Sequence, residues 1–254
     1  MPFYRTLKEI KKQRNLTAGE RILINQCDNG QDCNLNDGAR PERADPECTI
    51  RADILRFFIL GGDDTCPIPP SGINIRGAFI EGQLDLCDAT ARGSIALVRC
   101  RFGEPIAAPR SRVGQVNLTG SAFSRLDFTN AVVGGTLIMD GASSTGGVEL
   151  VGIVIQGQLS CNDAQFINAS GDALNAQGAT IGGGAFLQRI EANGEVSFAG
   201  ATIGGQLACD GGNFINPRGD ALNAQRATIE RSAFLRRIEA NGEVSFAGRQ
   251  LTGN

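Results

Sequence analysis

Four cysteines near the start of the chain are the residues best suited to metal or redox chemistry. They are Cys27, Cys33, Cys48 and Cys66, out of eight cysteines in all. Cysteine thiolates bind structural Zn²⁺, usually from closely spaced C-x-x-C pairs, and oxidised thiols form disulfides. The spacings here are irregular and contain no such pair, so a zinc site, two disulfides and free thiols all remain open. An enzyme that uses these four cysteines is therefore one alternative for the function.

Carboxylates form the second set of residues with possible chemistry. Asp172 and Asp220 lie in matching GDALNAQ segments, and Glu195 and Glu243 lie in matching ANGEVSFAG segments. A row of carboxylates could hold a cation, whereas aspartates in turns usually bind their own backbone and exposed glutamates are solvated. We interpret the four residues as candidates for an interaction surface and find no catalytic residue among them.

Composition excludes several other kinds of chemistry. The chain has 254 residues and no histidine, which excludes Ser-His and Cys-His catalysis and histidine metal sites. No dinucleotide fingerprint, flavin motif or C-x-x-C redox pair is present, so we expect no cofactor. The formal net charge is −3, which gives no basic footprint, and we expect no direct nucleic-acid binding.

The sequence also bears on the compartment. The N-terminal residues MPFYRTLKEIKKQR are basic and polar, and no apolar segment of a signal peptide follows them. No run approaches the 18 apolar residues of a membrane span. Cysteines in a chain without a signal are typically reduced, so we predict a cytoplasmic protein.

Internal repeats dominate the second half of the chain. Residues Gly157–Gly204 align with residues Gly205–Thr252, and roughly two thirds of the positions are identical. A shorter module of about 11 residues recurs inside each unit with the pattern small-x-apolar-x-Gly-x-apolar-x-apolar. One copy runs from Ala201 to Cys209. Two positions depart from this period, because INASGDALNA and INPRGDALNA each carry about four extra residues.

The module predicts two very short strands around a corner. Apolar positions two residues apart enter one face of a strand, and the central glycine permits the corner. Two modules make a four-sided coil, and we expect about eight coils. In this scheme Cys161 and Cys209 point inward, while Thr180, Thr202 and Thr228 form a ladder outside. A segment at 103–112 places Arg110 and Arg112 inward, so we expect a loop and a break in register there.

The N-terminal 70 residues have a different pattern. Thr17 and Glu20 form a capping box, which predicts a helix from about residue 18. We expect a second helix to begin at Thr49 and to end at Gly61. We predict two regions: a helical cap over residues 1–70 and a β-helix repeat domain over residues 71–254.

These motifs resemble a known family. IRADILRFFILGGDD at 50–64, GINIRGAFIEGQLDLCDA at 72–89 and the later GATIGGQL-type modules are similar to bacterial pentapeptide-repeat-like β-helix proteins. The resemblance implies a mainly β fold, a right-handed, four-sided β-helix behind a small α-helical N-terminal cap. It supplies no catalytic residue.

The leading functional prediction is a non-enzymatic repeat scaffold that presents a rigid surface to an unknown protein partner. A DNA mimic that binds or inhibits a DNA topoisomerase is the alternative that the family suggests. The near balance of charges and a basic cluster at Arg226, Arg231, Arg236 and Arg237 argue against it. The sequence stops at Asn254 in the middle of a module, so a homodimer through the C-terminal end of the solenoid is a further possibility.

Overall fold

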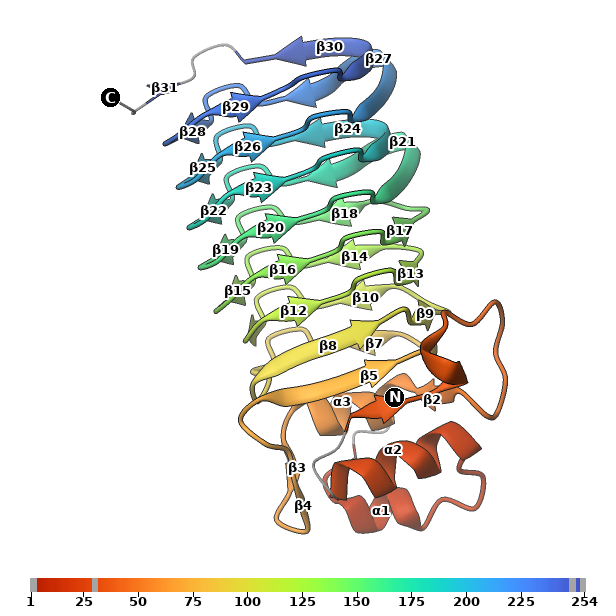
Figure 1. Ribbon diagram of the computed structural model, residues 1–254. Helices are drawn as coiled ribbons and strands as arrows, with labels where there is room; N and C mark the ends of the chain where they lie inside the picture. Colours follow the sequence, from red (N-terminus) through yellow and green to blue (C-terminus); the bar gives the residue numbers. More distant parts are fainter. Residues whose placement is uncertain (1–3, 29–31, 247–249, 252–254) are drawn as a thin grey trace.

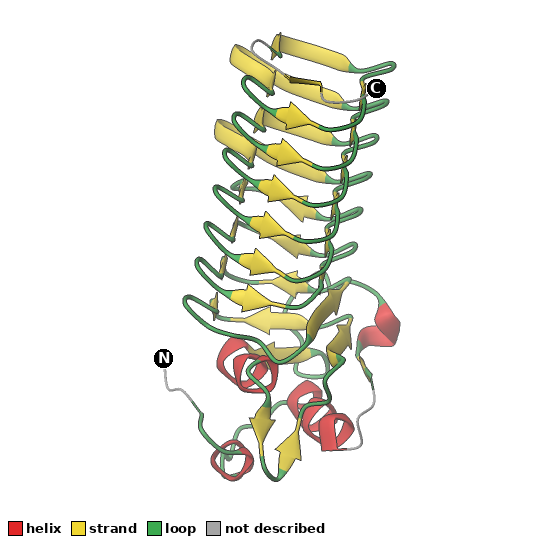
Figure 2. Cartoon of the chain, turned by 90° about the vertical axis from the view of Figure 1, so that its left-hand side faces the viewer, coloured by secondary structure: helices red, strands yellow, loops and turns green. Residues whose placement is uncertain are grey.

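The computed structural model of the protein describes residues 4–28, 32–246 and 250–251. It shows a mainly β solenoid of about eight coils, with a few helices at its N-terminal end (Figure 1). Figure 2 shows the short strands stacked in columns and the helices gathered at the end where the first coil begins. The fold class predicted from the repeats is therefore confirmed.

Each coil carries one short strand on each of four faces. Strands β12 (Val116–Asn117), β13 (Ala122–Phe123), β14 (Leu126–Asp127) and β15 (Val132–Val133) make one coil, and β16 (Leu137–Ile138) returns to the first face. Val116 of β12 pairs in parallel with Leu137 of β16, so the chain has risen by one rung between them.

The strands stack into parallel sheets along these faces. Face 1 contains β1 (Cys33–Asn34), β5 (Gly72–Arg76), β8 (Ser94–Val98), β12, β16, β20 (Leu159–Ser160), β23 (Ala185–Phe186), β26 (Leu207–Ala208) and β29 (Ala233–Phe234). Face 2 contains β2 (Thr49–Arg51), β6 (Phe79–Glu81), β9 (Arg101–Phe102), β13 and β17 (Ser143–Ser144). Face 3 contains β7 (Leu84–Asp85), β10 (Ile106–Ala107), β14 and β18 (Val148–Glu149). Face 4 contains β11 (Arg112–Val113), β15, β19 (Val154–Ile155), β22 (Thr180–Ile181), β25 (Thr202–Ile203), β28 (Thr228–Ile229) and β31 (Gln250–Leu251).

In the last coils the strands of faces 2 and 3 merge. The extra residues of the two repeat units do not form simple turns but extend the backbone into long strands. These strands are β21 (Gln165–Asn175), β24 (Glu191–Ser197), β27 (Asn213–Asn223) and β30 (Glu239–Ser245). They pair in parallel, with register shifts at the inserted residues.

The interior is filled by the side chains that the modules predict to point inward. Ile203, Leu207, Val196 and Phe198 are all 0% exposed. Cys161 is buried two rungs below Cys209, as expected, because β20 pairs with β23 and β23 pairs with β26. The predicted threonine ladder also forms on the outside of face 4.

Large and small side chains alternate inside the solenoid. Phe166, Ala192 and Phe214 follow one another on successive rungs of face 2. Phe198 lies at the later corner, on a rung whose neighbours carry alanines there, Ala176 and Ala224. Each of these coils therefore holds one phenylalanine on the merged face. Its position alternates between the start and the end of that face from one coil to the next. This alternation fills a narrow interior at high density without overpacking.

The expected loop at 103–112 was wrong. Residues there form a regular coil with β10 and β11, and Arg110 and Arg112 are exposed. Ile106 pairs with Leu84 and Arg112 with Thr90, each 22 residues earlier, so the period of two modules runs through the segment without a break. Ser111 and Val113 therefore take the inward positions, one residue later than expected, and the arginines face solvent.

Helices and two short strands of the cap region cover the first coil. They include α1 (Leu7–Lys11), α2 (Ala18–Asp28) and α3 (Ala52–Ile59), a short helical turn at Asn36–Gly38, and the hairpin of β3 (Gly62–Asp63) and β4 (Cys66–Pro67). The Thr17–Glu20 capping box is confirmed: the Glu20 N–H donates to Thr17 Oγ1 and the Thr17 N–H to Glu20 Oε2, both at 3.0 Å. None of the described helices is long and apolar enough to cross a membrane.

The predicted start of the last cap helix was wrong. Thr49–Arg51 forms the strand β2, and the helix begins at Ala52. Thr49 pairs with Phe79 and Arg51 with Glu81 of the first coil. A strand is favoured here because its backbone groups hydrogen-bond to the first strand of face 2 in the solenoid. A helix would leave the backbone groups of that strand unpaired. The cap region thus supplies the first rungs of faces 1 and 2.

Candidate interaction surface along the carboxylate row

Four carboxylates lie on successive rungs where faces 2 and 3 merge. We call Asp172, Glu195, Asp220 and Glu243 the carboxylate row. Asp172 of β21 pairs with Glu195 of β24, and Asp220 of β27 pairs with Glu243 of β30. Neighbouring strands of a sheet are about 4.8 Å apart, so the backbones of the two residues in each pair lie about that far apart. The structure therefore brings together all four residues that the sequence suggested for an interaction surface.

Asparagine and serine side chains close to the row donate hydrogen bonds to these carboxylates. Asn175 Nδ2 donates to Asp172 Oδ2 at 2.8 Å, and Asn223 Nδ2 donates to Glu195 Oε1 at 3.0 Å. On the last of the four rungs, Ser245 Oγ donates to Glu243 Oε1 at 3.0 Å. Hydrogen bonds between charged and neutral groups fix the orientation of the charged group. Each carboxylate keeps acceptor positions for a partner, since a carboxylate accepts several hydrogen bonds.

The backbone beside the row is held by asparagines. Asn168 Nδ2 donates to the backbone oxygen of Asp172 at 2.9 Å, and Asn216 Nδ2 donates to that of Asp220 at 2.8 Å. The alternative that these aspartates bind their own backbone is therefore not what the structure shows. It is the asparagine four residues earlier that closes the inserted segment, and the Asp172 carboxylate binds a side chain.

Glycines at the corner allow the uninserted coils to fit between the inserted ones. Gly194 has a φ of +121°, and a Cβ there would lie 2.4 Å from the backbone oxygen of Gly171. Gly242 has a φ of +136°, and a Cβ there would lie equally close to the backbone oxygen of Asn216. Only glycine adopts such angles freely, so these two positions set the spacing of the row.

Burial changes the protonation of the carboxyls at one end of the row. Asp172 is half-buried, and loss of hydration raises its pKa, while the hydrogen bond from Asn175 acts in the opposite direction. The pKa of Glu149, one rung below, is also raised by burial, with Arg125 lowering it and the negative charge of Asp172 raising it. A cation or a hydrogen-bond donor from a partner would be favoured here because it offsets this lost hydration.

Three of the four cysteines that the sequence suggested as metal ligands are described, and they lie in different parts of the fold. Cys33 lies on face 1, Cys48 precedes β2 on face 2, and Cys66 lies in the β3–β4 hairpin. The side chain of Cys27 lies outside the described residues. Among the residues that are described, no group of three or more cysteines and carboxylates could hold a metal ion.

Most described thiols are buried in apolar surroundings. Burial raises the pKa of Cys33 to about 12, with a further contribution from Cys100. The pKa of Cys100 and that of Cys209 are likewise raised to about 12 by burial. Nucleophilic and redox-active cysteines have lowered pKa values, so these thiols are suited to packing.

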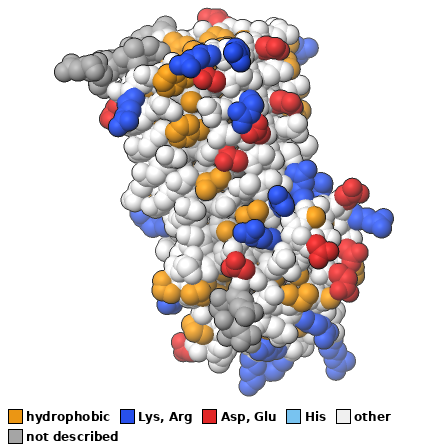
Figure 3. Space-filling view, in the orientation of Figure 1, with side chains coloured by type: hydrophobic (Ala, Val, Ile, Leu, Met, Phe, Trp, Pro, Cys, Tyr) orange, Lys and Arg blue, Asp and Glu red, His pale blue; other side chains and the backbone are white. Residues whose placement is uncertain are grey.

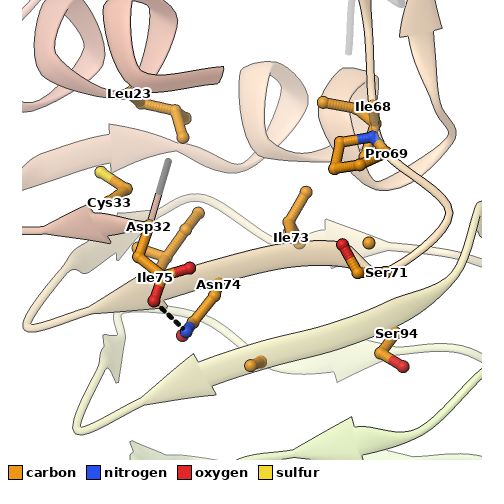
Figure 4. A pocket seen from close by; sticks show the side chains of 12 residues that line it. Leu23, Asp32, Cys33, Ile68, Pro69, Ser71, Ile73, Asn74, Ile75 and Ser94 are labelled. Atoms are coloured by element: carbon orange, nitrogen blue, oxygen red, sulfur yellow. Dashed lines mark hydrogen bonds between the residues drawn. The ribbon is translucent and has the colours of Figure 1, made fainter. Parts of the chain in front are cut away.

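A cavity that the sequence did not reveal lies between the cap and face 1 (Figure 4). It has a volume of about 260 Å³ and is lined by Leu23, Cys33, Ile68, Ile73 and eight further residues, among them Asn74. Asn74 Nδ2 donates to Asp32 Oδ2 at 2.8 Å across its mouth. The lining comes from segments far apart in the chain, which is why no sequence motif marks it.

Comparison of the chain with family models, with curated proteins and with solved structures finds no match. The site is therefore interpreted from its own geometry.

Proposed function

We propose that the protein is a non-enzymatic repeat scaffold that presents a rigid surface to a protein partner. The observation that carries the proposal is the carboxylate row. The sheet pairs its residues two by two, and the carboxylates of Asp172, Glu195 and Glu243 each accept a hydrogen bond from an asparagine or serine side chain, so they lose little conformational freedom on binding.

The chemistry of the thiols supports the same proposal. Cys161 and Cys209 are fully buried in the solenoid core, and burial raises the pKa of both thiols. Cys100 is equally enclosed beneath face 1. Such thiols pack as small apolar side chains, which favours a structural role over catalysis.

Two narrower assignments belong to this proposal. The four faces and the short modules support a likeness to the pentapeptide-repeat-like β-helix proteins of bacteria. Cys33, Cys48, Cys87 and Cys100 form no disulfide, which is typical of a reducing compartment such as the cytoplasm.

Site-specific photocrosslinking tests the scaffold. A photoreactive residue at Ile167, which is 41% exposed on the same strand as Asp172, should crosslink a partner in cell extract. The matched control is the same residue at Thr202, which is exposed on face 4. Replacement of Glu195 and Asp220 by their amides should weaken the Ile167 crosslink and leave folding intact. Equal crosslinking from both positions, or turnover of a substrate with no crosslink, would contradict the proposal.

A DNA mimic that acts on a topoisomerase is a second candidate, because the row repeats negative charges along a rod. The exposed arginines of the last coils oppose it, since they break the negative surface. A gyrase supercoiling assay separates the two. The scaffold proposal expects no inhibition at micromolar protein, and inhibition that disappears with Asp172→Asn and Asp220→Asn would favour the mimic.

A further inference from the structure

The two repeat units offer an internal comparison, because they share one backbone path and differ at about a third of their positions. Their inward side chains are largely the same. The second unit carries arginine at four described positions where the first has neutral residues: Arg218, Arg226, Arg231 and Arg236 in place of Ser170, Gly178, Gly183 and Gln188. All four arginines are exposed. The substitutions therefore alter the surface of the last coils and not their core.

The second unit also removes a carboxylate. In the first unit, Arg189 forms a two-pronged ion pair with Asp163, at 2.6 Å from Nε to Oδ1 and 2.7 Å from Nη2 to Oδ2. Arg237 is the equivalent arginine of the second unit, and Gly211 stands where the aspartate would be. Of the described carboxylates, none forms an ion pair with Arg231, Arg236 or Arg237.

Three of these arginines flank one strand of face 1. Arg231 precedes β29, and Arg236 and Arg237 follow it at the next corner. Phe234 of β29 points outward between them and is half-buried, and the guanidinium carbon of Arg236 lies 5.2 Å from the centre of its ring. We call Arg231, Phe234, Arg236 and Arg237 the arginine face. In Figure 3, basic side chains lie beside hydrophobic ones at the upper end of the solenoid.

Acidic neighbours limit which partner this surface fits. Asp210 is half-buried, and its carboxylate accepts the backbone N–H of Arg236 at 2.8 Å. Glu230 and Glu239 are exposed close to the arginines in the chain. Nucleic-acid binding needs a broad positive field that releases many counterions, which this mixed surface does not supply. Arginine and aromatic side chains side by side are instead typical of the residues that carry protein–protein binding energy.

We infer that the arginine face binds a short acidic segment of a protein partner, with carboxylates paired to the arginines and an apolar side chain on Phe234. At about 3.3 Å per extended residue, the segment from Arg231 to Arg236 spans at most roughly 16 Å. An extended peptide of about five residues, with acids at both ends and an apolar residue between them, matches this length. The inference rests on the proposed scaffold function and names the chemistry of one partner.

Fluorescence anisotropy with the full chain tests the inference. The probe is a labelled peptide with two glutamates on each side of a leucine, and the control peptide has glutamines instead. The key variant is Arg231→Gly with Arg236→Gln, which installs the residues that the first unit carries at these positions and so should fold. Its affinity for the acidic peptide should fall about tenfold, which corresponds to about 1.4 kcal/mol for the two lost charged contacts together. The control variant Arg189→Gln, at an arginine already paired with Asp163, should change it less than twofold.

Several outcomes would overturn the inference. They are no binding of the acidic peptide, equal binding of the glutamine peptide, an equal loss in the Arg189→Gln variant, and tighter binding of an oligonucleotide of equal charge. Failure here is distinguishable from failure of the scaffold. A crosslink from Ile167 without peptide binding would retain the scaffold and remove the arginine face. Peptide binding without a crosslink would retain the arginine face and remove the carboxylate row as the surface that a partner contacts.

Discussion

At the scale of single residues, the Glu20 carboxylate joins the cap to the solenoid. Its side chain is 0% exposed and accepts hydrogen bonds from the Arg51 backbone N–H at 3.1 Å and from Arg51 Nε at 2.7 Å. It also accepts the Thr17 N–H of the capping box. One buried group therefore satisfies the start of α2, the strand β2 and the charge of Arg51. A buried charge is tolerated when it is paired in this way.

We expect Glu20→Gln to lower the free energy of unfolding by about 2–4 kcal/mol, because it leaves the half-buried Arg51 guanidinium without its counter-charge. Urea denaturation followed by circular dichroism measures the change. Asp88→Asn is the matched control, since Asp88 pairs with Arg110 in an equally short ion pair that is exposed on both sides. An equal loss in the two variants would show that burial of the pair does not matter.

Asp172 is expected to make stability depend on pH. Its pKa is raised in the folded protein by burial, so the unfolded chain loses this proton first and stability falls as pH rises through this range. Asp172→Asn should therefore match the wild type in acid and be more stable at neutral pH. Asp163→Asn should do the opposite, because the hydrogen bond from Arg189 lowers the pKa of Asp163 and the ion stabilises the fold above that range. Urea titrations between pH 3 and 7 test both signs, and parallel curves would contradict them.

At the scale of elements, the long strands β21, β24, β27 and β30 depend on alternation of inserted and uninserted rungs. The inserted rungs close through Asn168 and Asn216, and the uninserted rung that follows each of them approaches its backbone closely at Gly194 or Gly242. The strands themselves are held by parallel pairing along both halves of the merged face. The geometry of the carboxylate row is thus a property of four strands together.

We expect Gly194→Ala to destabilise the protein by about 2 kcal/mol or more, because the new Cβ would strike backbone atoms of the inserted rung. Gly178→Ala is the control. Gly178 has a φ of +63° with nothing within 4 Å of an added Cβ, and its equivalent in the second unit is Arg226, so the loss should be about 1 kcal/mol or less. Thermal and urea unfolding measure both. Similar losses would mean that backbone angle alone, and not the close rung, restricts Gly194.

At the scale of the whole molecule, each coil of the solenoid packs against the coil before it and the coil after it. The apolar interior is continuous from the cap helices to the last described coils. Exposure rises toward the last described coil: Val196 is 0% exposed, and Val244, its equivalent in the second unit, is 36% exposed. The homodimer predicted through this end stays a prediction.

Light scattering coupled to size exclusion tests that dimer. We expect a mass twice that of the 26.7 kDa chain at micromolar concentration, because burial of the half-exposed apolar side chains of the last coil favours association. Val244→Lys should return the mass to that of one chain. Val154→Lys, at a side chain 38% exposed on the middle of face 4, should not. A monomer at all concentrations would remove the prediction.

The sequence alone determined how the chain winds. Which side chains enter the core is a local property, set by the two-residue period of strands and by corner glycines, so Val196, Ile203 and Leu207 could be placed without any distant contact. The carboxylate row also followed from the repeat, because identical units stack in register.

Only the tertiary structure decided the features that depend on the pairing register between coils or on contacts between segments remote in the chain. Pairing with Thr90 of the previous coil set the register that turns Arg110 and Arg112 outward, and pairing with Phe79 made Thr49 the start of a strand. The Glu20–Arg51 ion pair joins two segments that are remote in the chain. Cys33, Cys48 and Cys66 are placed in different parts of the fold by contacts of the same long-range kind. Periodicity records the direction of each side chain relative to its neighbours, whereas contacts between rungs depend on the lengths of every coil between them.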